Sequence, residues 1–107
     1  MPFVREAYDA VIAIALAAQA AGSTDGSAIR DQLTSIATPG GATVFPGPAG
    51  VRAALDAAGR GDDINYEGAA TTVDWDDVGD VTSGYIEIWE YRDGGIVALR
   101  DVPFSVD

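Results

Sequence analysis

The chain contains no cysteine and no histidine among its 107 residues. Without cysteine it can form no disulfide and can use no thiolate as a nucleophile or metal ligand. Without histidine it has no imidazole for a serine-type triad or for a zinc site. These absences remove many common catalytic mechanisms. The sequence contains no recognisable catalytic group, and we predict no catalytic residue, no metal and no cofactor.

Lysine is also absent, so six arginines stand against seventeen acidic residues, and the formal net charge is -11 at pH 7. A surface of this sign repels the phosphates of nucleic acids and the headgroups of anionic membranes. We expect no nucleic-acid partner. The excess of acid is otherwise typical of a protein kept soluble by its charge, for instance in salty surroundings.

No apolar run reaches the length of about 20 residues that a membrane-spanning helix needs. The longest run covers residues 10–18, and Glu6 and Asp9 precede it where a signal peptide would carry basic residues. No pattern of small residues typical of a cleavage site follows it. We expect no membrane span and no signal peptide in this chain.

This apolar run belongs to a helix predicted over residues 4–21, with Gly22 as its C-terminal stop. Because residues 10–18 are apolar on every side, we expect this helix to be buried on more than one side. Asp9 lies outside the main apolar stripe. The members of that stripe, at helical spacing, are Val4, Tyr8, Val11, Ile12, Ala15 and Leu16.

Two further helices are predicted in the first half of the chain. Asp25 is placed to accept a backbone N–H bond as the N-cap of a helix over residues 26–37. Pro48 suits the first position of a third helix, which Gly59 ends. Residues 61–68 then read as a polar loop. Its apolar anchors are Ile64 and Tyr66.

The second part of the chain has the period-two pattern of strands. We predict a strand over residues 71–75, a turn over 76–80, a strand over 84–92 and a return strand over 96–99, with a hairpin turn at 93–95. The second strand carries bulky side chains on both faces, so we expect both faces to be covered. One face holds Ile86 and Ile88, and the other holds Tyr85, Trp89 and Tyr91. The aromatic row could stack on a ligand, although core packing is its commoner use.

The predicted fold class is α+β, with about three helices followed by a short β-hairpin or three-stranded sheet. Residues 1–70 form the helical part, and residues 71–107 form a crossover strand and a C-terminal hairpin. We expect the two parts to make a single compact unit. The tail from Asp101 contains Pro103 and is weakly specified.

Acidic residues offer two patterns with possible chemistry. The run 74–80 begins like a calcium-binding loop, but Val78 and Tyr85 stand where that loop needs oxygen ligands. A solvated turn is the favoured interpretation. Glu87 and Glu90 lie three positions apart in a strand, so they face opposite sides and cannot act together as acid and base.

A set of short motifs resembles one known family. In chain order they are AYDAV at 7–11, AGSTDG at 21–26, IRD at 29–31, FPGP at 45–48, GDDINYEGA at 61–69, VDWD at 73–76, GDV at 79–81, YIEIW at 85–89 and DG at 93–94. Their order and spacing resemble the C-terminal part of substrate-binding proteins of ABC transporters, of the branched-chain amino acid or amide type. These proteins have the type I periplasmic-binding-protein fold.

The resemblance implies a fragment of a two-lobed α/β fold that holds its ligand in the cleft between lobes, without catalysis. The implied partners are a small solute (an amino acid or an amide) and an ABC permease, both in the full-length context. The implied location is periplasmic or extracellular. The matching position for a cleft-lining residue is Phe3, and Tyr8 near the same helix start is a second candidate ligand-binding residue.

An alternative function is a small self-associating structural or interaction domain with no small-molecule ligand. Helices meant to pack on a larger sheet would leave apolar faces open, and a second copy could cover them. The strand over residues 84–92 could also pair with its counterpart through an exposed edge. We therefore expect the isolated chain to be a homo-oligomer. A third and more distant alternative is a small enzyme that uses Asp and Glu.

Overall fold

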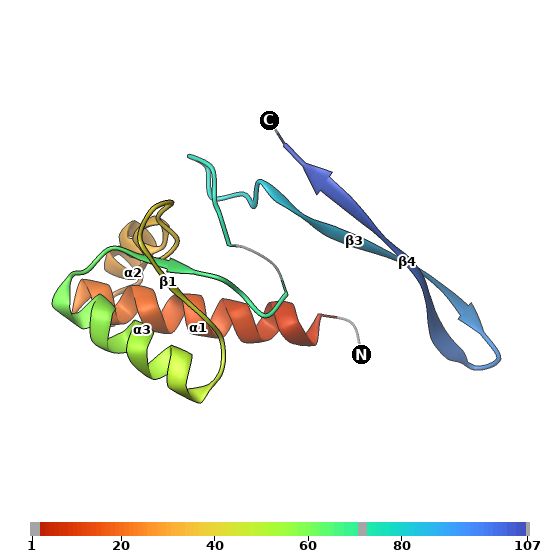
Figure 1. Cartoon of the computed structure of the whole chain (residues 1–107), viewed down its shortest axis with the longest axis horizontal. Coiled ribbons are helices and arrows are strands. Elements are labelled where there is room, and N and C mark those ends of the chain that lie inside the picture. The colour runs from red at the N-terminus through yellow and green to blue at the C-terminus, as the bar shows by residue number, and fades with distance from the viewer. Residues whose placement is uncertain (1–2, 71–72, 107) are drawn as a thin grey trace.

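The computed structural model describes residues 3–70 and 73–106, and its elements form two visibly different parts. In the first part α1, α2 and α3 gather around the short strands β1 and β2, and in the second β3 and β4 extend away as a long hairpin (Figure 1). The molecule measures 50 × 31 × 24 Å. The predicted α+β class is confirmed.

Helix α1 spans Val4–Ala21 and ends at Gly22, as predicted. Gly22 adopts the left-handed conformation, and its N–H donates to the carbonyl oxygen of Gln19 at 3.3 Å. Only one face of α1 is buried, and Val11 and Ile14 on another face are exposed. The expectation of burial on more than one side is therefore wrong, because the elements that contact α1 leave that other face uncovered. The buried residues are Asp9, Ala13, Leu16 and Ala17.

Helix α2 spans Gly26–Gln32, shorter than predicted. Its N-cap is confirmed, since the Asp25 carboxylate accepts a bond of 3.1 Å from the N–H of Ala28. At its C-terminal end the Ser35 hydroxyl donates to the Gln32 carbonyl oxygen at 2.8 Å. This bond satisfies a carbonyl that a continuing α-helix would use, and the chain tightens instead into the 3-10 turn η1, Thr34–Ile36.

Strand β1 (Ala42–Val44), helix α3 (Pro48–Arg60) and strand β2 (Ile64–Tyr66) form a β-α-β unit with parallel strands. Pro48 begins α3 as predicted, but the helix passes the predicted stop at Gly59 and is capped by Gly61 in the left-handed conformation. The predicted loop over 61–68 contains a strand. Its two anchors alternate into the core, where Ile64 and Tyr66 are both fully buried.

The core lies where this unit packs on α1 and η1. Small residues let the helices approach closely, because Ala17 of α1 and Ala54 of α3 have no exposed surface. Leu16 and Tyr66 provide the bulk of the core. Gly41, just before β1, has no room for a side chain, since a Cβ there would lie 2.9 Å from the carbonyl carbon of Ile64.

The segment between β2 and the hairpin differs from the predicted strand over 71–75. Residues 71 and 72 lie outside the described residues, and the following residues make only a single antiparallel bridge, between Trp75 and Val81. The predicted turn is confirmed. The Asp76 carboxylate accepts bonds from the N–H groups of Val78 and Asp80, at 3.0 and 2.9 Å. The chain therefore folds back on itself here instead of extending.

The hairpin consists of β3 (Ser83–Arg92) and β4 (Gly95–Ser105), which are antiparallel. Its turn is confirmed: Asp93 and Gly94 both have positive φ, 52° and 78°, as a two-residue turn that matches the strand twist requires. The register shifts between Ile88 and Trp89, so that Leu99 is an extra residue in β4. The tail judged weakly specified continues this strand to Ser105.

Both faces of β3 are exposed, so the expectation that they are covered is wrong. Tyr85 is 68% exposed on one face and Ile86 is 54% exposed on the other. The two strands pair only with each other, and no helix packs across them in residues 3–70 or 73–106. Figure 1 shows the hairpin standing clear of the helices.

Among the described helices, none has the length and apolar character needed to cross a membrane.

Candidate functional site

The candidate site is a groove of about 950 Å³ between the first turn of α1 and the hairpin, mainly the hairpin face that carries Tyr85 and Trp89. Phe3, Val4, Arg5 and Glu6 form the wall at the start of α1. The hairpin supplies the opposite wall. Its main lining residues are Tyr85, Glu87, Trp89, Ile96, Asp101 and Phe104. The two walls of the groove therefore come from segments that lie far apart in the sequence.

The alternation of side chains along β3 explains why this wall is aromatic. Residues two apart in a strand share a face, so Tyr85, Trp89 and Tyr91 lie on the same side of the hairpin. Ala98 and Ile96 of β4 stand directly opposite Trp89 and Tyr91. The small side chain at position 98 leaves the indole ring open to the groove, and Trp89 is 51% exposed.

Charges in the groove are arranged in two groups. Glu87 of β3 and Asp101 of β4 are cross-strand partners, so two carboxylates face the groove side by side. Two like charges in such a position destabilise the hairpin and attract a cationic group. Arg5, at the opposite wall, is the one cation among the described lining residues. Glu6 follows Arg5 and also lines the groove, so the wall at α1 carries one guanidinium and one carboxylate, whereas the hairpin wall carries two carboxylates beside an aromatic surface.

A buried carboxylate holds the chain beside this groove. Asp9 of α1 is only 6% exposed and accepts three hydrogen bonds. Its donors are the Tyr66 hydroxyl at 3.0 Å, the Ala69 N–H at 2.7 Å and the Ala70 N–H at 2.8 Å. Ala70 is itself a lining residue. The bonds therefore fix the segment that leaves β2 against α1, at the edge of the groove.

The environment of Tyr66 suits this role. Desolvation by burial, together with the hydrogen bond to Asp9 and the negative charge of its carboxylate, raises the pKa of the Tyr66 phenol above its usual value. The phenol therefore stays protonated and remains a donor to Asp9.

Comparison of the chain with protein-family models, with curated proteins and with solved structures found no match.

The structure places the two predicted ligand-binding residues differently. Phe3 lines the groove, is 76% exposed and adopts the left-handed conformation with φ 65°, which is strained for a bulky residue and is more common at functional sites. Tyr8 does not line the groove. Its hydroxyl accepts a bond of 3.0 Å from the N–H of Gly47, in the loop between β1 and α3. The groove therefore includes Phe3 but not Tyr8.

Sequence reasoning missed Asp9, which it placed on the polar side of α1. The signal was present, because Asp9 stands directly before the apolar run and a carboxylate there must either reach water or find donors. Its donors come from residues about 60 positions later, and no local pattern indicates them. Arg5 and Asp101 were missed as well, since the groove that contains them depends on how the hairpin lies.

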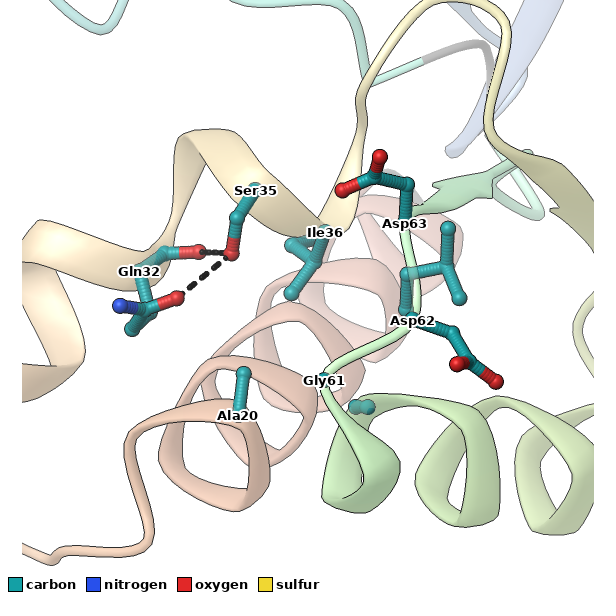
Figure 2. Close-up of a pocket in the computed structure, with 9 residues that line it drawn as sticks. Ala20, Gln32, Ser35, Ile36, Gly61, Asp62 and Asp63 are labelled. Carbon is teal, nitrogen blue, oxygen red and sulfur yellow. Dashed lines mark hydrogen bonds between the residues drawn. The ribbon is translucent and has the colours of Figure 1, made fainter.

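A second, smaller cavity of about 170 Å³ lies at the other end of the helical part (Figure 2). Several of its polar groups already have partners: the Ser35 hydroxyl lies 2.8 Å from the Gln32 side-chain oxygen, and Asp62 accepts from Arg60, outside the cavity lining, at 3.0 Å. It also lies at the amino end of β2, whereas ligands of parallel α/β units bind near the carboxyl ends of the strands. The larger groove is therefore the better candidate.

The acidic side chains do not form a recognisable metal centre in the described part of the chain, where no group of three could hold an ion together. The carboxylate of Asp76 is engaged in its own turn.

Proposed function

We propose that the chain is a ligand-binding, non-catalytic segment of a solute-binding protein for ABC-type uptake of amino acids or amides. The observation that carries the proposal is the arrangement of the groove. Arg5 suits a carboxylate or a carbonyl oxygen, the pair Glu87 and Asp101 suits an ammonium or amide N–H group, and Trp89 suits an apolar side chain. A zwitterionic amino acid carries all three kinds of group.

Hydrogen bonds between two of the motifs that resemble the family also support the proposal. Two of the motifs that carry the resemblance lie far apart in the sequence, at residues 7–11 and 61–69. Asp9 of the first motif binds the Tyr66 hydroxyl and the Ala69 N–H of the second. The motifs therefore form one structural unit beside the groove, as parts of a common site would.

In this proposal the isolated chain is a poor binder. A small-molecule site usually buries most of its ligand, whereas Tyr85 and Trp89 in the hairpin wall of this groove are 68% and 51% exposed. A second lobe would close the groove in the full-length protein, which would act outside the cytoplasm and deliver the solute to an ABC permease.

The test combines calorimetry with NMR titration of the 107-residue chain, using leucine and acetamide as probes. We expect no micromolar binding heat, and shifts of the Trp89 indole N–H only at millimolar solute. Phe3→Ala should weaken these shifts, whereas Phe45→Ala, at an exposed residue outside the groove, should leave them unchanged. Micromolar heat would contradict the need for a second lobe. Unchanged Trp89 signals at saturating probe would contradict a binding role for the groove.

A second candidate function is the small self-associating domain without a small-molecule ligand. The observation that favours it is the exposure of apolar side chains on both faces of the hairpin.

A further inference from the structure

The two outer edges of the hairpin differ in their capacity to pair with another strand. The N–H of Val106 donates to the Thr82 carbonyl oxygen at 2.8 Å. In an antiparallel pair the residues of each strand alternate, so that the main-chain N–H and C=O groups of one residue point inward to the partner strand and those of the next point outward to the free edge. The bond between Val106 and Thr82 shows that both of these residues point inward. Counting back along β4, Pro103 occupies an outward position, where it offers no N–H. Leu99 adds a bulge to the same strand. Proline and a bulge are both known protections of a strand edge, so the outer edge of β4 is blocked.

The outer edge of β3 carries neither protection. Its outward positions are those of Tyr85, Glu87, Trp89 and Tyr91, each with a free N–H and carbonyl oxygen on that side. The strand is 10 residues long, contains no proline and keeps its alternation past the bulge, because the extra residue lies in β4. An edge of this length without protection is a template for a further strand.

We infer that β3 pairs antiparallel with β3 of a second copy of this chain, around a two-fold axis at Ile88, to form a four-stranded sheet. Two free edges can form hydrogen bonds only where an outward-pointing residue of one copy stands opposite an outward-pointing residue of the other. The two-fold axis must therefore lie at a residue that faces its own copy, and not between two successive residues. With the axis at Ile88, Tyr85 faces Tyr91 of the second copy and Glu87 faces Trp89. The overlap then extends over the full span from Gly84 to Arg92.

Neighbouring registers are less favourable. An axis at Glu87 places this carboxylate directly opposite its own copy, which is repulsive. An axis at Trp89 shortens the overlap and brings Asp93 of the turn opposite Tyr85. With the axis at Ile88 no two acidic residues stand opposite each other: Tyr85 meets Tyr91, Ile88 meets its own copy, and Glu87 and Glu90 each meet an apolar side chain. Repulsion between carboxylates thus disfavours the axis at Glu87, and the shorter overlap of the strands disfavours the axis at Trp89.

The distribution of charge also favours a second copy at this edge. Residues 83–105 carry four acids and two arginines, whereas residues 74–80 carry four acids and no base. Two copies therefore repel each other less at the hairpin than at the acidic segment before it. Because the remaining repulsion is electrostatic, added salt should strengthen the dimer. A two-fold contact of this kind closes on itself and stops at two copies, since the outer edges of the new sheet are the blocked edges of β4.

Pairing would also join the aromatic faces of the two hairpins. The two-fold axis is perpendicular to the sheet, so the rows of Tyr85, Trp89 and Tyr91 from both copies lie on the same side. Tyr85 and Tyr91 are 68% and 71% exposed in the single chain, and each would gain an aromatic cross-strand neighbour.

Single-cysteine variants provide the sharpest test, because the natural chain has no cysteine. In the inferred register Ile88 faces its own copy as a pair without hydrogen bonds, with a Cα separation of about 4.5 Å. That separation is within reach of a disulfide. We expect Ile88→Cys to form a covalent dimer under mild oxidation. Leu99→Cys, at the exposed bulge of the blocked edge, is the matched control and should stay monomeric.

Sedimentation velocity on the unmodified sequence and on two lysine variants completes the test. We expect a monomer–dimer equilibrium that shifts toward dimer with concentration and with salt. Ile88→Lys brings two positive charges together at the axis and should abolish the dimer. Ile86→Lys places its charge opposite Glu90 of the second copy and should retain it. A monomer at millimolar concentration, equal cross-linking of the two cysteine variants, or a dimer that survives Ile88→Lys would each overturn the inference.

Discussion

The carboxylate of Asp9 and the hydroxyl of Tyr66 are joined by a buried hydrogen bond of 3.0 Å that crosses 57 positions of sequence. The same carboxylate accepts the N–H groups of Ala69 and Ala70, so one side chain of α1 binds both the end of β2 and the segment that follows it. A buried charge is stable only when its hydrogen bonds are complete, and these three donors meet that need. Asp9 therefore connects the start of the chain to the edge of the candidate groove.

Asp9→Asn should destabilise the fold by about 2–3 kcal/mol, because an amide can offer only one oxygen to donors on two sides. At least one of the two main-chain N–H groups would then face an NH2 group and lose its acceptor. Urea unfolding followed by circular dichroism measures the difference.

Asp31→Asn is the matched control for this change. Asp31 pairs with Arg30 at 2.8 Å on an exposed surface, where ion pairs contribute little. The free energy of unfolding should change by less than about 0.5 kcal/mol. Equal effects of the two substitutions would show that Asp9 is not a structural acceptor.

The raised pKa of Tyr66 predicts a loss of stability in alkaline solution. In the unfolded chain a tyrosine ionises near pH 10, whereas folded Tyr66 keeps its proton to higher pH. The contribution is fully present below pH 10 and decreases as the pH rises above it, with a slope of up to about 1.4 kcal/mol per pH unit. Tyr66→Phe should remove this slope from unfolding curves measured between pH 9 and 11. An unchanged slope in the variant would contradict the assignment.

Two glycines of α3 should respond in opposite ways to alanine. A Cβ on Gly50 would overlap the main-chain carbonyl oxygen of Phe45, so the loop before α3 would have to move. We expect Gly50→Ala to destabilise by about 1–3 kcal/mol, the usual cost of overpacking. A Cβ on Gly59 meets only the side-chain amide of Gln19, which can turn away.

Gly59→Ala should therefore stabilise α3, by up to about 1 kcal/mol, through the higher helix propensity of alanine. Thermal unfolding of both variants measures the contrast. If Gly50→Ala raised the melting temperature as Gly59→Ala does, the close approach of Phe45 to the helix would be refuted.

Leu16 and Ile14 test which face of α1 is buried. Leu16 has no exposed surface, and Leu16→Ala should cost about 2–5 kcal/mol through lost burial and the cavity left behind. Ile14 is exposed, and Ile14→Ala should change the free energy of unfolding by less than about 0.5 kcal/mol. A large loss at Ile14 in dilute solution would mean that the exposed face is covered, as the sequence had suggested.

Features with a local cause could be predicted from the sequence. The cap at Asp25, the first helical residue Pro48 and the turn at Asp93 each depend on the conformational habits of one or two residues, and all three are confirmed. Element ends were less predictable where two signals compete. Gly59 and Gly61 could both end α3, and Gly61 is the one that adopts the left-handed capping conformation.

Features with a distant cause could not be predicted. The strand Ile64–Tyr66 looked like a loop because three residues are too few for a periodic pattern, and its partner β1 is equally short. The aromatic row of β3 was recognised, but its pattern does not say what covers it. Phe3 was assigned to a ligand site by resemblance, whereas Arg5 and Asp101 enter the groove only through the arrangement of α1 and the hairpin.

The bonds of Asp9 also set an order of events during synthesis. Its acceptor oxygens are made early, but the Ala70 N–H that one of them binds lies 61 positions later. Until that residue has left the ribosome, α1 presents an unpaired carboxylate and an uncovered apolar face to its surroundings. The hairpin pairs residues 3 to 22 positions apart, and it can close within microseconds of its own completion. The helical part is synthesised first, but α1 therefore completes its contacts only after Ala70 has been synthesised.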